Sequence, residues 1–180
     1  MKASLLLGSL ALCVACVPAC ETSDATQAVF DNQYPVTDAG AADSVVIYKA
    51  WWSVAELSAP VAAGAESAPL RVVKGTDYAY ALLAVGWDPA SGTVPTTLLP
   101  VRTSAQLTAD RGDTLEIQIS DATVLGNCFT GKPLAQADAD FITQRIFPTE
   151  FAGQSYDATT CTLSLARDGG EAGASGAAAQ

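Results

Sequence analysis

The side chains that could carry chemistry are carboxylates, lysines and hydroxyl residues, because the chain contains no histidine. This absence excludes a Ser-His-Asp triad, a Cys-His pair, an imidazole metal ligand and a histidine proton shuttle. A serine could still pair with Lys49, Lys74 or Lys132, and paired carboxylates could hydrolyse a glycosidic bond. However, no Gly-rich elbow surrounds a serine and no phosphate-binding loop is present. We therefore expect a non-catalytic protein without a cofactor, and we keep a carboxylate-based hydrolase as the least favoured alternative.

Acidic side chains gather in two stretches that could suggest a calcium site. The members are Asp110, Asp113, Glu116 and Asp121 in the first stretch, and Asp138 and Asp140 in the second. Calcium needs about six to eight converging oxygens, and no spaced Asp-x-Asp-x-Asp-Gly loop is present. The cysteines cannot complete a zinc site without histidine. We therefore interpret the carboxylates as solvated surface charge and expect no metal.

Aromatic residues are the candidates for stacking on a ligand: Trp51, Trp52, Tyr78 and Tyr80. Adjacent residues of a strand point to opposite faces. Strict alternation predicts one face with Val46, Tyr48 and Trp52, and the other with Val45, Ile47, Lys49 and Trp51. An exposed aromatic face could stack on sugar rings or anchor a protein partner. Alternatively, the N-terminal segment, a helix or the Ala-rich loop at 54–66 covers the second face.

The first twenty residues have the pattern of a secretory signal peptide. Lys2 supplies a positive charge, residues 5–17 are almost wholly apolar, and small residues precede Cys20. The apolar stretch is shorter than the roughly 20 residues that a membrane-spanning helix needs. The alternative is a buried N-terminal core element.

Cysteines at 13, 16 and 20 fall where bacterial lipoprotein signals place the lipid-modified residue. This segment therefore resembles a bacterial lipoprotein precursor, which implies a lipid anchor in the cell envelope, either at the outer membrane or facing the periplasm. We favour Cys20, with Cys16 as the alternative, because cleavage before Cys20 leaves no odd thiol. Cleavage after Ala19 without acylation would instead give a soluble secreted protein.

The remaining cysteines, Cys128 and Cys161, are expected to form a disulfide in an oxidising compartment. Two free buried thiols are the alternative.

Composition divides the chain into a signal peptide at 1–19, an acidic flexible tether at 20–43, a folded domain at 44–167 and a disordered Gly/Ala tail at 168–180. The tether carries acidic side chains and no basic one, so it should stay extended. Its apolar residues Val29-Phe30 and 34–36 could instead dock on the domain as an edge strand.

Period-two alternation of apolar residues predicts short strands across the folded segment. Alternation predicts strands at 99–107, 114–120 and 160–165. Strands are also expected at 44–53 and 77–87, where both faces are apolar or aromatic, and at 70–74, which is rich in β-branched residues. Gly, Pro and Asp residues predict turns at 74–77, 87–92 and 110–113, and the last turn accounts for the Arg111-Gly112-Asp113 string. Short strands at this spacing predict an all-β fold, an antiparallel β-sandwich that is immunoglobulin-like or similar.

One short helix is expected between Pro133 and Pro148, both of which limit helical geometry. Its apolar stripe is predicted to comprise Leu134, Ala137, Phe141, Ile142 and Ile146.

The formal net charge of −10 disfavours nucleic acid, because phosphate contacts need clustered Lys and Arg. The sequence thus predicts a non-catalytic, lipid-anchored envelope protein that is structural or binds a protein or glycan. A carbohydrate-binding module that uses the exposed Trp and Tyr residues is the main alternative.

Overall fold

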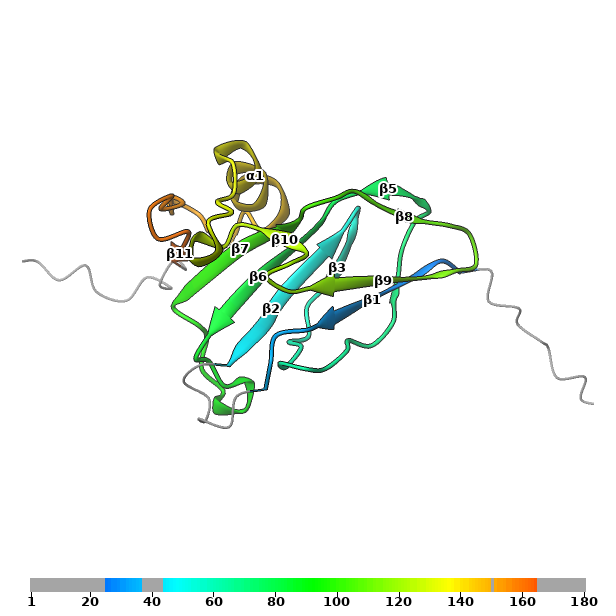
Figure 1. Ribbon diagram of the computed structural model, residues 1–180, viewed down its shortest axis with the longest axis horizontal. Helices are drawn as coiled ribbons and strands as arrows, with labels where there is room; N and C mark the ends of the chain where they lie inside the picture. Colours follow the sequence, from blue (N-terminus) through cyan, green and yellow to red (C-terminus); the bar gives the residue numbers. More distant parts are fainter. Residues whose placement is uncertain (1–24, 37–43, 150, 165–180) are drawn as a thin grey trace, which may run out of the picture.

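The computed structural model describes residues 25–36, 44–149 and 151–164 (Figure 1). It is mostly β, and two sheets pack face to face with a short helical layer on the outer face of the larger sheet. The predicted β-rich sandwich with one helix and one disulfide is therefore confirmed.

The large sheet has the strand order β10-β7-β6-β2-β3, with β11 also paired to β7, and every pair in it is antiparallel. Its strands are β2 (Val45–Trp52), β3 (Ala55–Leu57), β6 (Ala79–Val85), β7 (Thr97–Thr103), β10 (Val124–Leu125) and β11 (Leu163–Ser164). Strand β6 lies in the middle and is buried on both faces, as its continuous apolar sequence requires.

The small sheet corrects two expectations. Its order is β4 (Leu70–Arg71), β1 (Gln27–Asn32), β9 (Thr114–Ile119), and β1 runs parallel to β9, so the sandwich is not wholly antiparallel. Strand β1 falls inside the segment expected to be a flexible tether. It is also the central strand rather than an edge strand, because β4 and β9 pair with its two sides, and its Ala28 and Phe30 side chains are fully buried. The domain therefore begins before residue 44.

The connections match the expected turns at two of three places. Asp88 caps the short 3-10 helix η2 (Pro89–Ser91), and the Asp113 amide donates to the Asp110 carbonyl in the second turn. The third stretch instead forms strand β5 (Gly75–Asp77), which pairs with β8 (Leu107–Ala109) in a two-stranded ribbon. Pairing of β8 with β5 also divides the strand expected at 99–107 into β7 and β8.

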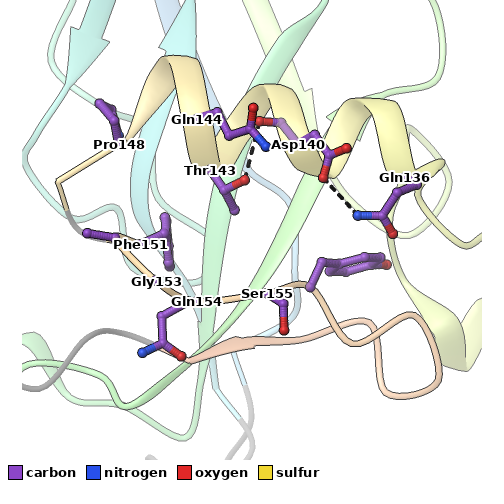
Figure 2. A pocket seen from close by; sticks show the side chains of 11 residues that line it. Gln136, Asp140, Thr143, Gln144, Pro148, Phe151, Gly153, Gln154 and Ser155 are labelled. Atoms are coloured by element: carbon purple, nitrogen blue, oxygen red, sulfur yellow. Dashed lines mark hydrogen bonds between the residues drawn. The ribbon is translucent and has the colours of Figure 1, made fainter.

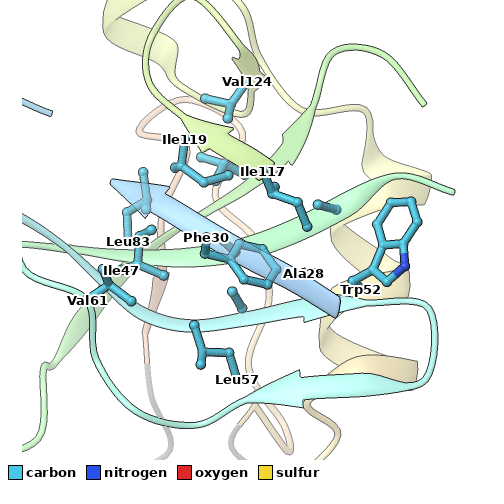
Figure 3. Close-up of a cluster of buried hydrophobic side chains, with 14 of the residues drawn as sticks. Ala28, Phe30, Ile47, Trp52, Leu57, Val61, Leu83, Ile117, Ile119 and Val124 are labelled. Atoms are coloured by element: carbon cyan, nitrogen blue, oxygen red, sulfur yellow. The ribbon is translucent and has the colours of Figure 1, made fainter. Parts of the chain in front are cut away.

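An inter-sheet core fills the space between the two sheets (Figure 3). Its largest buried members are Phe30, Ile47, Trp52, Leu83, Val101, Ile117 and Ile119. In β9, Ile117 and Ile119 are fully buried, as the alternation predicted over 114–120 requires, whereas Leu115 is partly buried. Buried Asn32 joins the two sheets because its side-chain amide donates to the carbonyls of Val45 and Val61, both at 2.9 Å.

A β-bulge in β2 breaks the alternation expected there. The register against β6 shifts between Ile47 and Lys49, so Ile47 and Trp52 both face the inter-sheet core. Tyr48 and Trp51 pack on the opposite face. Strict alternation predicted that Ile47 and Trp51 share a face, and this prediction was wrong. The extra residue of the bulge moves the side chains that follow it to the opposite face of the strand.

An outer core covers the other face of the large sheet, beneath the helix. The helix begins as α1 (Gln136–Phe141) and continues as a π-helical turn, η4 (Ile142–Ile146), which ends before Pro148 as expected. Its buried residues are Ala139, Ile142 and Ile146, not the predicted Ala137, which is exposed.

A long excursion carries this helix away from β7 and returns to it. Strands β10 and β11 pair with residues 102–103 and 97–98 of β7, so they occupy the two ends of one edge. The disulfide Cys128–Cys161 closes the base of the excursion just beyond these strands, with a Cα–Cα distance of 5.6 Å. Cys161 has a φ of 54°, so β11 starts only at Leu163 rather than at the expected residue 160.

Gly126 marks the start of the excursion and has no room for a side chain. A Cβ atom there would lie 2.2 Å from the carbonyl oxygen of Pro100 in β7, and φ is 109°. Only glycine allows the chain to leave β10 this close to the sheet.

Candidate functional site

The predicted stacking residues do not form an open aromatic surface. Trp52 is fully buried in the inter-sheet core, and Tyr80 is 8% exposed in the outer core. Trp51 and Tyr78 are half-buried on the same side as Tyr80, where Trp51 packs edge-on against Phe147. The helical excursion covers this face, as the second of the two alternatives expected, and these four rings form no open stacking surface.

Arg102 of β7 forms an ion pair that joins the large sheet to α1. Its Nε lies 3.0 Å from Oδ2 of Asp138 in α1, and its guanidinium stacks 4.0 Å from the centre of the Tyr78 ring. Burial raises the pKa of the neighbouring Tyr80, and the Asp138 carboxylate raises it further. Arg102, Asp138 and Tyr78 therefore hold the layers together rather than offering groups to a ligand.

A half-exposed aromatic pair lies beyond the predicted set. Tyr48 and Trp87 meet edge to face with ring centres 5.4 Å apart, and the Trp87 indole donates to the Thr93 carbonyl at 3.0 Å. The bulge in β2 brings Tyr48 to this face. Because a bulge leaves no clear sequence pattern, alternation alone could not identify this pair.

A hollow lies between the helix and the chain that follows it (Figure 2). We call it the helix–loop pocket; it has a volume of about 530 Å³. Its helical side comprises Gln136, Asp140, Thr143 and Gln144, and its loop side comprises Pro148 and the residues from Phe151 to Tyr156. The sequence predicted the apolar stripe of this helix. On the opposite face of the helix, polar residues recur every three or four positions, and these residues line the pocket.

The groups lining this pocket are amides, hydroxyls and one carboxylate. Gln136 donates to Asp140 Oδ1 at 2.8 Å, and the Thr143 hydroxyl donates to the Ala139 carbonyl at 3.1 Å. Buried Phe151 and Tyr156 supply apolar surface, and burial raises the pKa of Tyr156. No Lys or Arg belongs to the described lining, so the pocket has hydrogen-bonding capacity without an anion-binding charge.

A smaller pocket of about 240 Å³ lies beside β9. It is lined by Thr103, Ser104, Ala105, Leu107, Glu116, Gln118, Ala122 and Thr123. We call it the β9 pocket. Its lining contains one carboxylate, as the described lining of the helix–loop pocket does, so the described residues of neither pocket supply the pair that a glycosidase requires.

The other candidate groups lie apart from one another. Over residues 25–36, 44–149 and 151–164, no group of three or more Cys, Asp or Glu side chains could hold a metal ion. The Arg-Gly-Asp string occupies an exposed turn. Lys132 donates to the carbonyl of Asp121 at 2.9 Å, and Lys49 pairs with Glu56 at 3.5 Å.

The predicted disulfide between Cys128 and Cys161 is confirmed, whereas Cys16 and Cys20 lie outside the described residues. No helix in the described part of the chain is both long enough and apolar enough to cross a bilayer.

Comparison of the chain with models of known protein families, with curated proteins and with solved structures found no match. The function must therefore be argued from the geometry of the fold and its pockets.

Proposed function

We propose that this protein is a non-catalytic binding domain of the bacterial envelope, lipid-anchored through Cys20, and that it binds a neutral, hydroxyl-rich ligand such as a glycan. The helix–loop pocket is the observation that carries this proposal. Glutamine amides both donate and accept hydrogen bonds, and Asp140 accepts them from hydroxyl groups. Such groups, beside the small apolar surface that Phe151 and Tyr156 contribute, suit the hydroxyl groups of a sugar.

The charge of the pocket argues for a neutral ligand. Asp140 would repel phosphate or carboxylate, and the described lining offers no cation to offset that repulsion. The Gln136–Asp140 bond also holds the carboxylate in place before a ligand arrives. A prearranged acceptor lowers the entropy that binding must overcome.

The anchor and compartment are supported by the lipoprotein-like signal and by the disulfide, which suits an oxidising location. Strand β1 begins at Gln27, so only residues 21–26 separate it from Cys20. A fully extended chain spans at most about 25 Å between Cys20 and Gln27. The folded domain would then be held close to the membrane surface by a short linker.

Binding can be tested by NMR titration of the full domain with neutral and anionic oligosaccharides. We expect neutral sugars to shift amides at Gln136, Asp140 and Gln154, and Asp140→Ala to weaken binding by about tenfold. Arg145→Ala is the matched control, because Arg145 is exposed on the same helix but does not line the pocket. Shifts that map elsewhere, or equal losses in the two variants, would overturn the proposal.

The anchor can be tested by labelling the full precursor with a palmitate analogue in a bacterial host. We expect label in the wild-type chain and in Cys16→Ser, and none in Cys20→Ser. Label that survives Cys20→Ser but not Cys16→Ser would move the anchor to Cys16. An unlabelled wild-type chain would establish a soluble secreted protein instead.

A further inference from the structure

The strand edges of the two sheets are not equally covered. The outer edge of β7 is occupied by β10 and β11, and the edge of β2 by β3 and by the bridge from Ile47 to Val61. Strand β9 has β1 on one side, and the described residues place no strand on its other side. It is also the longest edge strand described, with six residues.

The register with β1 determines which backbone groups of β9 point away from the sheet. The Gln27 amide donates to the Asp113 carbonyl and the Gln33 amide to the Ile119 carbonyl, both at 3.0 Å. Since alternate residues of a parallel strand bond to the same neighbour, 115, 117 and 119 bond to β1. The outward groups, which we call the β9 edge, therefore belong to Thr114, Glu116 and Gln118.

The β9 edge is largely available for hydrogen bonding. Among its groups, the Gln118 carbonyl accepts a bond from the Thr123 hydroxyl at 2.7 Å. The amide and carbonyl of Glu116, at the middle of the edge, bond to no other strand in the described chain. An extended peptide could pair with such groups and so add a strand to the sheet.

The β9 pocket adjoins this edge, so it could receive a side chain of an added strand. Glu116 and Gln118 line it from β9, while Leu107 and Ala105 line its far side. Its volume of about 240 Å³ is enough for one large side chain. Backbone pairing combined with a side-chain pocket is the usual way in which peptides are recognised by strand addition.

Charge selects the occupant of this edge. Asp110, Asp113, Glu116 and Asp121 are all exposed along or beside β9, where they outnumber the two nearby cations. These are Arg111, exposed in the turn before β9, and Lys132, whose ammonium is bonded to the carbonyls of Asp121 and Ala122. A second copy of this chain would place Glu116 and its acidic neighbours close to their own equivalents, and this repulsion disfavours self-pairing. A cationic strand would meet opposite charge.

We propose that the β9 edge binds an extended, Lys- or Arg-bearing segment of a partner protein, which adds to the small sheet as its fourth strand. This interaction is independent of the helix–loop pocket, because Gln136 and Asp140 take no part in it.

The test uses a synthetic peptide of alternating Lys, Val and Thr residues, titrated into the full domain and followed by NMR. We expect amide shifts centred on residues 114–118. A peptide N-methylated along one edge keeps the other edge free and should still bind. A peptide N-methylated along both edges cannot donate backbone hydrogen bonds and should lose binding.

Charge reversal provides the matched pair of variants. Glu116→Lys keeps the backbone of β9 and should weaken peptide binding by about tenfold. Glu66→Lys makes the same change at an exposed residue on the β4 side of the small sheet, and should leave binding unchanged. Equal binding of the doubly methylated peptide, equal effects of the two variants, or shifts away from β9 would each overturn the proposal.

Discussion

The inter-sheet core and the outer core share β6 and β7 but are built in different ways. Regular strands supply most of the inter-sheet core, and each contributes every second side chain. One face of β6 and β7 meets a short helix, a π-helical turn and an irregular loop in the outer core, where Phe147, Phe151 and Tyr156 are buried. Repeated ladder bonds define the first core, whereas the second depends on a covalent bridge.

The largest expected effect comes from removing the Phe30 side chain, which β1 contributes to the inter-sheet core. Phe30→Ala empties a fully buried site on β1, so we expect the free energy of unfolding to fall by about 4 kcal/mol. Val36→Ala, at a residue that is 72% exposed, should change it very little. Urea unfolding followed by tryptophan fluorescence measures both, and similar effects would show that β1 is not part of the core.

The disulfide tests the outer core separately. The Cys128→Ala/Cys161→Ala double variant opens a loop with a sequence separation of 33, which should cost about 3–4 kcal/mol. We expect hydrogen exchange to accelerate in α1 and η4 while β1 and β9 stay protected. Uniform acceleration across both sheets would mean that the two cores unfold as one unit.

Gly126 tests the junction where the outer layer leaves the large sheet. Gly126→Ala should cost about 2–3 kcal/mol, because its Cβ would collide with the Pro100 carbonyl and its φ is unfavourable. Gly112→Ala also has a positive φ but open space around it, so we expect about 1 kcal/mol. Thermal denaturation compares the two, and equal losses would rule out the close approach.

The smallest effect concerns alkaline pH. Burial raises the pKa of Tyr34 beside the inter-sheet core and of Tyr80 and Tyr156 in the outer core. Folding then favours the neutral form, so stability is constant below about pH 10 and falls above it. Tyr156→Phe should reduce the loss of stability above about pH 10 that is measured at the backbone amides of α1 and η4. Tyr34→Phe should reduce the loss measured at the backbone amides of β1. Exchange rates measured across this range would contradict the assignment if the two variants acted alike.

The same contrast explains what the sequence could predict. Alternation located β9 and most of β7, since burial of every second side chain leaves a period of two, and longer apolar runs located most of β2 and β6. It missed the bulge after Ile47, which reverses the faces of β2, and it placed Ala137 rather than Ala139 in the helix core. Composition favoured a flexible tether over strand β1, because the segment contains the polar residues Gln27 and Asp31. The residues that alternate with them are nevertheless buried.

The candidate site was less accessible to sequence reasoning than the fold. The aromatic residues near β2 and β6 were noticed, but their exposure depended on whether a distant helix folded over them. Gln136 and Asp140 became lining residues because the loop at 151–156 returns beside them, and no local pattern encodes that return.

The parallel pairing of β1 with β9 also determines the order of folding. Gln27 is paired with Thr114, so the first strand of the domain must wait for a partner far along the chain. Until then Phe30 stays exposed to water. High contact order slows such folding, so the N-terminal strand stays unpaired until the chain as far as β9 is available to pair with it.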